Sequence, residues 1–117
     1  MRERQSGNLF ANLTPPSPDE RFEALLETDG VMLERIVSTG QATPEGEWYD
    51  QPRAEWVVLL KGSAGIRFED DQDVRALGPG DYLFIPVHAR HRVEWTSETE
   101  ATVWLALHLP GADERSS

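Results

Sequence analysis

From Val31 onward the chain alternates short apolar segments with clusters of glycine, proline and acidic residues. The apolar segments are rich in valine, isoleucine, leucine and aromatic residues, the composition that suits a half-buried strand. The pattern predicts strands near residues 31–38, 46–50, 54–61, 64–69, 73–77, 82–86, 90–96 and 101–109. Tight turns are expected at 61–64, 70–73 and 78–81. Several short strands at such close spacing indicate an all-β sandwich or barrel.

Two of the predicted strands are apolar on both faces. Residues 56–60 read Trp-Val-Val-Leu-Leu, and the apolar residues of 103–109 also fall on both sides of their strand. A strand with one face in water would alternate apolar and polar residues instead. One face should therefore line the interior, and the other should be covered by an N-terminal helix or by a second subunit. The apolar surface left on an isolated chain predicts a homodimer.

The first thirty residues predict an arm followed by a helix. Residues 1–16 are polar at first and then proline-rich, and we expect them to form an N-terminal arm. The run Ser-Pro-Asp-Glu at 17–20 matches a capping box, and the apolar residues at 22, 25 and 26 share one helical face. These features predict a helix over 18–28. The expected organisation is one domain at 17–109 and a C-terminal tail at 110–117.

Composition narrows the classes of function. The 117-residue chain has no cysteine, which excludes disulfides, thiolate metal sites and cysteine nucleophiles. Its formal charge is −10, from 21 acidic and 11 basic residues, and this disfavours nucleic acid and anionic membranes. No apolar run approaches the roughly 18 residues of a membrane-spanning helix. We therefore expect a cytoplasmic protein that binds neither nucleic acid nor a membrane.

The segment 80–91 carries the first resemblance to a known family. It reads Gly-Asp-Tyr-Leu-Phe-Ile-Pro-Val-His-Ala-Arg-His and resembles the second motif of the cupins, in which glycine, proline and histidine stand at fixed spacings. Gly80, Pro86 and His91 occupy those positions, and His88 stands where the family usually has a second glycine. Physically, the glycine turn begins a strand, Pro86 ends its pairing, and the chain then turns His91 toward the interior.

The segment 48–62 resembles the first cupin motif in an altered form. Cupins typically carry two histidines one residue apart, then a glutamate, and then a glycine that closes a hairpin. Counting back from Gly62 places Glu55 at the glutamate position, whereas Trp48 and Asp50 occupy the two histidine positions. The resemblance covers residues 31–109 and implies a double-stranded β-helix, or jelly-roll, barrel.

The resemblance also implies a candidate metal site. Metal-binding cupins hold their ion with three histidines and one glutamate. The matching positions of this chain offer Asp50, Glu55 and His91 as metal ligands, with His88 as a fourth. Imidazole and carboxylate donors suit divalent iron, manganese or zinc. Trp48 and Tyr49, next to this motif, and His108 in the last strand are candidates for the ligand pocket.

Alternative interpretations remain open for each group. Glu55 could instead pair with a neighbouring arginine, His91 could be a hydrogen-bonded core residue, and Asp50 could belong to an ordinary turn. The leading hypothesis is a metal-binding cupin that acts on, or senses, a small organic molecule. The alternative is a non-catalytic cupin that binds a small ligand or serves a structural role without metal. A third hypothesis is metal-free acid–base catalysis by His91 and a carboxylate.

Overall fold

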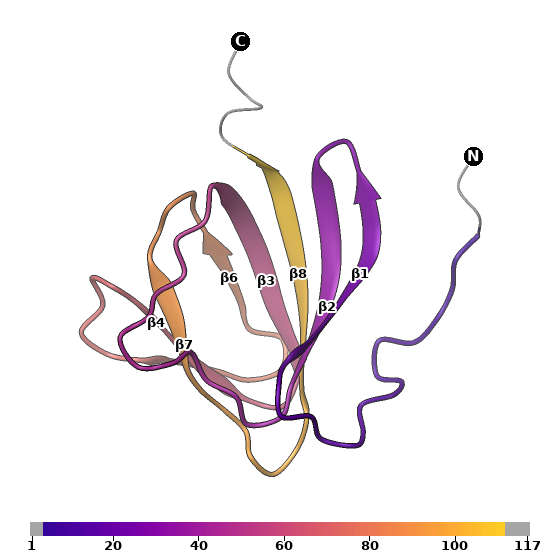
Figure 1. Cartoon of the computed structure of the whole chain (residues 1–117), viewed down its shortest axis with the longest axis horizontal. Coiled ribbons are helices and arrows are strands. Elements are labelled where there is room, and N and C mark those ends of the chain that lie inside the picture. Colours follow the sequence, from indigo (N-terminus) through magenta and orange to yellow (C-terminus); the bar gives the residue numbers. More distant parts are fainter. Residues whose placement is uncertain (1–3, 112–117) are drawn as a thin grey trace.

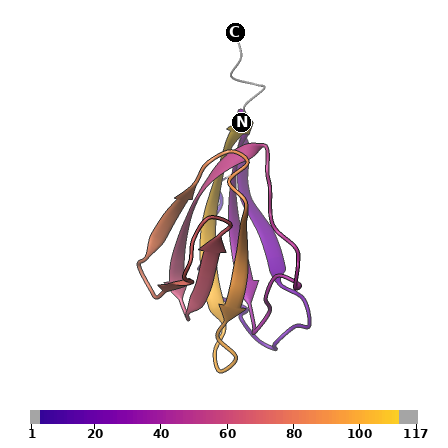
Figure 2. The same ribbon diagram turned by 90° about the vertical axis from the view of Figure 1, so that its left-hand side faces the viewer.

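The computed structural model describes residues 4–111, which form eight strands and no helix (Figure 1). In chain order the strands are β1 (Arg21–Thr28), β2 (Val31–Ser38), β3 (Arg53–Lys61), β4 (Ala64–Phe68), β5 (Arg75–Leu77), β6 (Tyr82–Ile85), β7 (His91–Thr96) and β8 (Thr102–Gly111). They form a five-stranded sheet in the order β1-β2-β8-β3-β6 and a three-stranded sheet in the order β5-β4-β7, with every pairing antiparallel. Figure 2 views the molecule from the side of the three-stranded sheet. The all-β prediction is confirmed.

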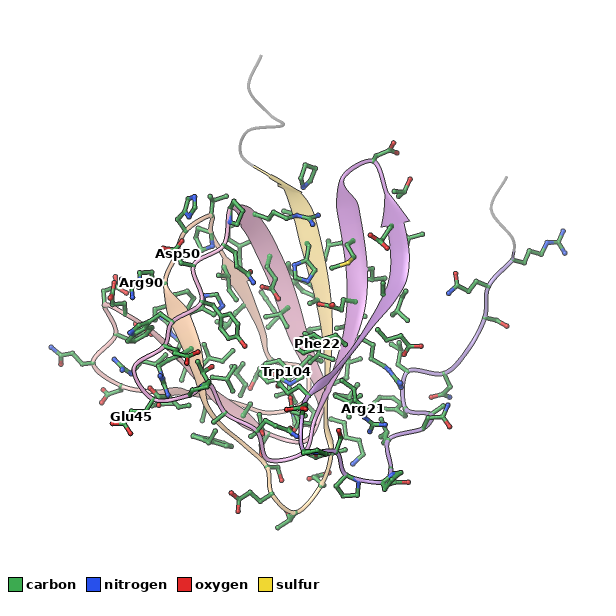
Figure 3. The ribbon with its side chains drawn as sticks, in the orientation of Figure 1. Arg21, Phe22, Glu45, Asp50, Arg90 and Trp104 are labelled. Atoms are coloured by element: carbon green, nitrogen blue, oxygen red, sulfur yellow. The ribbon has the colours of Figure 1, made fainter. Side chains whose placement is uncertain are left out.

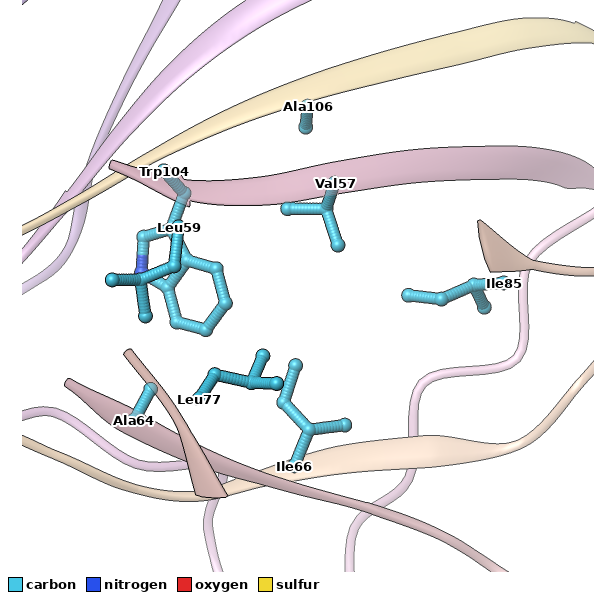
Figure 4. Packing of buried hydrophobic residues seen from close by; sticks show 8 residues of the cluster. All are labelled: Val57, Leu59, Ala64, Ile66, Leu77, Ile85, Trp104 and Ala106. Carbon is cyan, nitrogen blue, oxygen red and sulfur yellow. The ribbon is translucent and has the colours of Figure 1, made fainter. Parts of the chain in front are cut away.

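The core lies between the two sheets and follows from the two-residue period of the strands. β3 directs Val57 and Leu59 inward, where they meet Ile66 of β4 and Trp104 of β8 (Figure 4). The indole N–H of Trp104 donates a hydrogen bond of 3.1 Å to the Ser38 hydroxyl, so this large side chain is buried without an unsatisfied donor. Each fully buried aliphatic side chain contributes about 2 kcal/mol to folding relative to an exposed one.

The turn between β3 and β4 requires glycine. Gly62 has a φ angle of +89°, in the left-handed region that side chains disfavour. A Cβ atom at this position would also lie 2.3 Å from Thr102 Oγ1, which is closer than real contacts allow. Thr102 belongs to β8, so the absence of a side chain at Gly62 lets the turn pack directly against the five-stranded sheet. The tight turn predicted at 61–64 is present, but it does not close a hairpin, because β3 pairs with β6 and β8 whereas β4 pairs with β5 and β7.

The predicted helix over 18–28 is wrong, because these residues contain β1 instead. β1 pairs along its length with β2, and the two are joined by Asp29 and Gly30. Both turn residues have positive φ, +51° and +79°. This is the geometry of a two-residue type I′ hairpin, for which Asp-Gly is a preferred sequence. Pairing with β2 therefore overrides the capping box and the helical spacing of the apolar residues.

The segment 39–52 crosses the molecule beside β7 without forming the strand predicted at 46–50. The only pairing there, within the described residues, is a single bridge between Tyr49 and His91. The segment is fixed by the guanidinium group of Arg92, which donates hydrogen bonds to three of its carbonyl groups, those of Thr43, Pro44 and Glu47. Arg92 thereby replaces part of a strand ladder and sets the position of Tyr49.

The chain ends differ in detail from the expected organisation. Residues 4–16 of the predicted arm contain no strand and turn at residues 9–10, and Arg35 holds them by donating to the carbonyls of Leu9 and Ala11. β8 continues to Gly111, so two residues of the predicted tail belong to the sheet. Residues 1–3 of the arm and 112–117 of the tail lie outside the described residues. Across 4–111 no helix is long and apolar enough to cross a membrane.

Candidate functional site

A cavity of about 130 Å³ opens between the two sheets. An engineered cavity of about 150 Å³ in another protein holds benzene, so this space suits a small organic molecule. Its apolar wall is continuous with the core, and its polar groups come from β2, β3, β7, β8 and the segments before β1 and β3. The lining residues are Glu20, Phe22, Glu34, Ile36, Tyr49, Gln51, Glu55, Val57, Ile66, Ile85, His91, Val93, Trp104 and His108.

His91 is held in a fixed orientation at the start of β7. The side chain is 6% exposed, and its ring lies between those of Tyr49 and Phe68, with centroids 5.5 Å and 5.9 Å away. Its Nδ1 lies 2.8 Å from the carbonyl oxygen of Ala89. A carbonyl can only accept, so Nδ1 carries the proton. Nε2 makes no hydrogen bond within residues 4–111 and is available to a ligand.

Glu55 is the second buried polar group without a partner. It lies near the start of β3, opposite Ile85 of β6 and His108 of β8, and is 8% exposed. Its carboxyl group accepts no hydrogen bond from residues 4–111, although its oxygens are not sealed from the cavity. Burial raises the pKa of Glu55 above its ordinary value, and the nearby Glu34 adds to the increase, whereas His108 and His91 oppose it.

His108 and Glu34 form a pair on the same sheet as Glu55. Nε2 of His108 lies 2.9 Å from Oε1 of Glu34, and both side chains are largely buried. The two residues face the cavity from neighbouring strands, β8 and β2. The sequence prediction included His108 but missed Glu34. The available signal was an acidic residue between the apolar Met32 and Ile36 on one face of a predicted strand.

Tyr49 and Gln51 enter the cavity from the segment before β3. The bridge to His91, with backbone hydrogen bonds of 2.7 Å and 3.1 Å, fixes the position of Tyr49. Burial raises the pKa of the Tyr49 hydroxyl, and Glu20 raises it further, while a hydrogen bond with the Thr43 side chain lowers it. The net effect keeps Tyr49 protonated at neutral pH. It can therefore act as a hydrogen-bond donor.

Asp50 and His88 lie outside the cavity and bind each other. Asp50 Oδ1 is 2.6 Å from His88 Nδ1, and the two side chains are 47% and 62% exposed. His88 has a φ angle of +59°, the conformation that suits the glycine for which it stands in the motif. In this backbone conformation the His88 side chain lies largely in solvent. Figure 3 shows Asp50 at the outer edge of the molecule, away from Trp104.

Trp48 also lies outside the cavity. Its ring packs against three guanidinium groups, with the Arg67 carbon 4.9 Å, the Arg92 carbon 5.9 Å and the Arg90 carbon 6.0 Å from the ring centroid. Contacts of this kind are attractive because the ring face carries partial negative charge. Trp48 therefore anchors the segment 39–52 against β4 and β7. Of the three residues predicted for a ligand pocket, Tyr49 and His108 line the cavity and Trp48 does not.

The four predicted metal ligands do not converge on one point. Glu55 and His91 line the cavity, whereas Asp50 and His88 are bound to each other at the surface. Among residues 4–111 no group of three or more histidine, aspartate or glutamate side chains is arranged to hold a metal ion. A stable transition-metal site needs three or four such donors. The arrangement of these residues therefore does not fit the metal site that the motif resemblance implies.

The chemical capacity of the cavity follows from its unpartnered groups. The Nε2 atom of His91 is a proton acceptor, and Glu55 can accept hydrogen bonds or, because of its raised pKa, carry a proton itself. The Tyr49 hydroxyl supplies a donor on the same side. The site can thus bind a polar group directly and can move a proton to or from it.

Comparison with known proteins identifies the family. The cupin domain model matches residues 35–108, well over half of the chain. The chain belongs to the cupin family. This cupin is also 52% identical to a protein from Ralstonia eutropha JMP134 whose crystal structure is described as that of a "putative mannose-6-phosphate isomerase". The match covers 92% of this chain and 100% of that chain, with a TM-score of 0.90.

More distant structures confirm the fold alone. A cupin superfamily protein from Desulfitobacterium hafniense DCB-2 is 20% identical over 92% of this chain and 94% of that chain, with a TM-score of 0.70. A cupin with a double-stranded β-helix fold from Methanocaldococcus jannaschii is 16% identical over 97% and 96% of the two chains, with a TM-score of 0.72. Comparison with curated proteins gives no significant match. The predicted jelly-roll fold is confirmed.

Proposed function

We propose that this cupin binds a small organic molecule in the cavity between its sheets, through direct contacts with protein side chains. The observation that carries the proposal is the pair of buried, unpartnered polar groups, the Glu55 carboxyl and the His91 Nε2 atom, beside an apolar wall. An unpartnered buried polar group costs roughly 1–3 kcal/mol of stability. A ligand that hydrogen-bonds to both groups would remove this cost.

The activity named for the Ralstonia relative does not follow for this chain. A sugar phosphate carries a dianionic group, and recognition of such groups relies on arginine, lysine or backbone N–H groups. Among the residues that the structure describes, those that line the cavity include Glu20, Glu34 and Glu55 but no lysine or arginine. These carboxylates would repel a phosphate rather than bind it. We therefore assign no reaction, and the proposal is limited to binding of a small molecule.

Binding can be tested with benzyl alcohol, whose ring matches the size of the cavity. Titration into the ¹⁵N-labelled full chain should shift the indole N–H resonance of Trp104, because this residue lines the cavity. The variant Val57→Phe fills the cavity and should abolish the shift. Val58→Phe is a matched control, since Val58 is the next residue of β3 and faces away from the cavity. Binding that persists in Val57→Phe but not in Val58→Phe would overturn the proposal.

A metal-binding cupin is the second candidate, and one observation favours it. His91 donates its Nδ1 proton to a backbone carbonyl, the orientation that metal-ligating histidines commonly adopt. Elemental analysis of untagged protein purified without chelator separates the two candidates. Direct ligand binding predicts far less than one metal ion per chain. About one iron, manganese or zinc ion per chain, lost on combining Glu55→Ala with His91→Ala, would replace the proposal with the metal-binding function.

A further inference from the structure

Carboxyl groups predominate among the ionisable side chains that line the cavity, beside the imidazoles of His91 and His108. Within the described residues 4–111, three carboxyl groups line it, those of Glu20, Glu34 and Glu55, and no lysine or arginine does. The neighbouring guanidinium groups are directed to backbone carbonyls elsewhere. Arg53 donates to Leu109 and Gly30, and the guanidinium group of Arg92 serves the segment 39–52. Apart from the two imidazoles, of which that of His108 is paired with Glu34, a ligand inside the cavity meets carboxyl groups that no lysine or arginine of residues 4–111 compensates there.

The three carboxyl groups are not equivalent. Glu20 accepts a hydrogen bond from the Ser38 hydroxyl, and Glu34 is paired with His108. Glu55 has no partner within residues 4–111, although it is more than nine-tenths buried. The nearby His91 presents Nε2 as a second acceptor, because Nδ1 is committed as a donor to Ala89. The Glu55 carboxyl group and His91 Nε2 line one cavity and receive no hydrogen bond from residues 4–111, so they match a ligand group that carries two or more N–H bonds.

The rest of the wall suits an apolar body. The aromatic side chains of Phe22, Tyr49 and Trp104 line the cavity together with aliphatic residues of both sheets. Aromatic faces attract ammonium groups as well as apolar rings. The cavity thus combines an acidic, hydrogen-bond-accepting end with an apolar wall.

We infer that the cavity selects a small organic cation, a protonated amine on a compact apolar body, over neutral and anionic molecules of the same shape. The inference rests on the proposed function and adds the charge of the ligand. The ammonium group would donate hydrogen bonds to the Glu55 carboxylate and to His91 Nε2. Its charge would offset the carboxylates that a neutral ligand leaves uncompensated.

The inference is tested with three probes that share one ring and differ in charge: benzylammonium, benzyl alcohol and benzoate. Each is titrated at pH 7.5 into the chelator-treated full chain, and the dissociation constant is taken from the cavity resonances. Benzylammonium should bind about tenfold more tightly than benzyl alcohol, the effect of making one hydrogen bond charge-assisted. Benzoate should bind more weakly than both. This ranking is measured on the unaltered protein and requires no variant to fold.

Two substitutions assign the preference to Glu55. Glu55→Gln should bring the affinities for benzylammonium and benzyl alcohol to within about twofold of each other, because the charge-assisted hydrogen bond is lost. Glu45→Gln removes the same charge from an exposed position at the outer edge of the molecule (Figure 3) and should keep the tenfold ratio. Glu45 thus controls for the change in net charge.

The outcomes distinguish the inference from the proposed function. If benzyl alcohol or benzoate binds as tightly as benzylammonium, the inference is wrong and the proposed function stands. If the Glu45→Gln variant loses the preference as fully as Glu55→Gln, the effect belongs to the net charge and the inference is wrong. If none of the three probes shifts a cavity resonance, both the proposed function and the inference fail.

Discussion

β3 and β8 run through two halves of the barrel that differ in what their inward positions carry. The closed half lies near the turn between β3 and β4, and the cavity half lies toward the other end of these strands. Near the turn between β3 and β4, Leu59, Val103 and Thr102 are each 0% exposed, and Gly62 lets that turn approach β8 closely. Toward the other end of the same two strands, the inward positions carry Glu55 and His108. β8 stays paired with β2 and β3 through both halves (Figure 1), so the halves differ in their side chains and not in the pairing of these strands.

The closed half stabilises the fold, whereas the cavity half carries the polar groups that we propose bind the ligand. In the closed half, Leu59 and Val103 are fully buried, and the buried Thr102 hydroxyl donates a hydrogen bond to the carbonyl of Ser63. In the cavity half, the Glu55 carboxyl group and the His91 Nε2 atom lack, within residues 4–111, the hydrogen-bond partners that buried polar groups normally have. We therefore expect substitutions in the closed half to destabilise the fold. Removal of charge in the cavity half should stabilise the fold while weakening ligand selection.

The largest effect is expected from Leu59→Ala in the closed half. Leu59 is fully buried, and deleting its side chain should lower the free energy of unfolding by about 3 kcal/mol. Leu60→Ala is the matched control, because Leu60 follows in β3 and is only half-buried, and it should cost about 1 kcal/mol. Urea denaturation measures both variants. Equal losses would show that the closed half is not packed as described.

A smaller effect, of opposite sign, is expected from Glu55→Gln in the cavity half. The pKa of Glu55 is raised in the folded chain, so wild-type stability falls as pH rises from the unfolded value through the folded value. A glutamine side chain is uncharged, so burying it does not carry the free-energy cost of removing a charge from water. The variant should therefore be about 1 kcal/mol more stable than the wild type at pH 8 and closer to it at pH 5.

Urea denaturation at the two pH values measures the difference between wild type and Glu55→Gln. Glu45→Gln, at an exposed position, should show no such pH-dependent difference. A Glu55→Gln variant that is less stable than the wild type at pH 8 would mean that the carboxylate has a stabilising partner. The contrast between the two halves would then be lost.

The smallest effect is expected outside both halves, from Asp50→Asn. The pair of Asp50 and His88 is short, but both side chains are about half exposed. Exposed ion pairs contribute about 0–1 kcal/mol, so the change in unfolding free energy should stay below about 0.5 kcal/mol. Benzylammonium affinity should also be unchanged. A tenfold loss of affinity would place Asp50 at the cavity and contradict the separation of the two sites.

Most strands could be predicted from the alternation of apolar and polar residues, but β1 could not. The segments assigned to β2, β3, β4, β6, β7 and β8 were each predicted within two residues at both ends. For residues 18–28 the capping box and the helical spacing favoured a helix. The deciding signal was the Asp29–Gly30 turn, which makes the following strand available as a partner. Local propensity was outweighed by pairing with a neighbour.

The candidate site could be predicted in part, since Glu55 and His91 do face one cavity. Asp50 was grouped with them because motif spacing places it two residues after Trp48, but spacing does not reveal that His88 reaches it at the surface. Glu34 was missed because β2 belongs to neither motif. The homodimer stays a prediction. Tyr82 and Phe84 are exposed on the edge strand β6, and this apolar surface is the place to test for dimer formation.

The cavity shares part of its wall with the core, since Val57, Ile66, Ile85 and Trp104 belong to both. An occupant would thus fill space inside the folded interior and would have no comparable site on the unfolded chain. By mass action, a ligand at one hundred times its dissociation constant adds about 2.7 kcal/mol to stability. The melting temperature would then report the concentration of the natural ligand, and a cell that runs short of it would hold a more easily degraded protein.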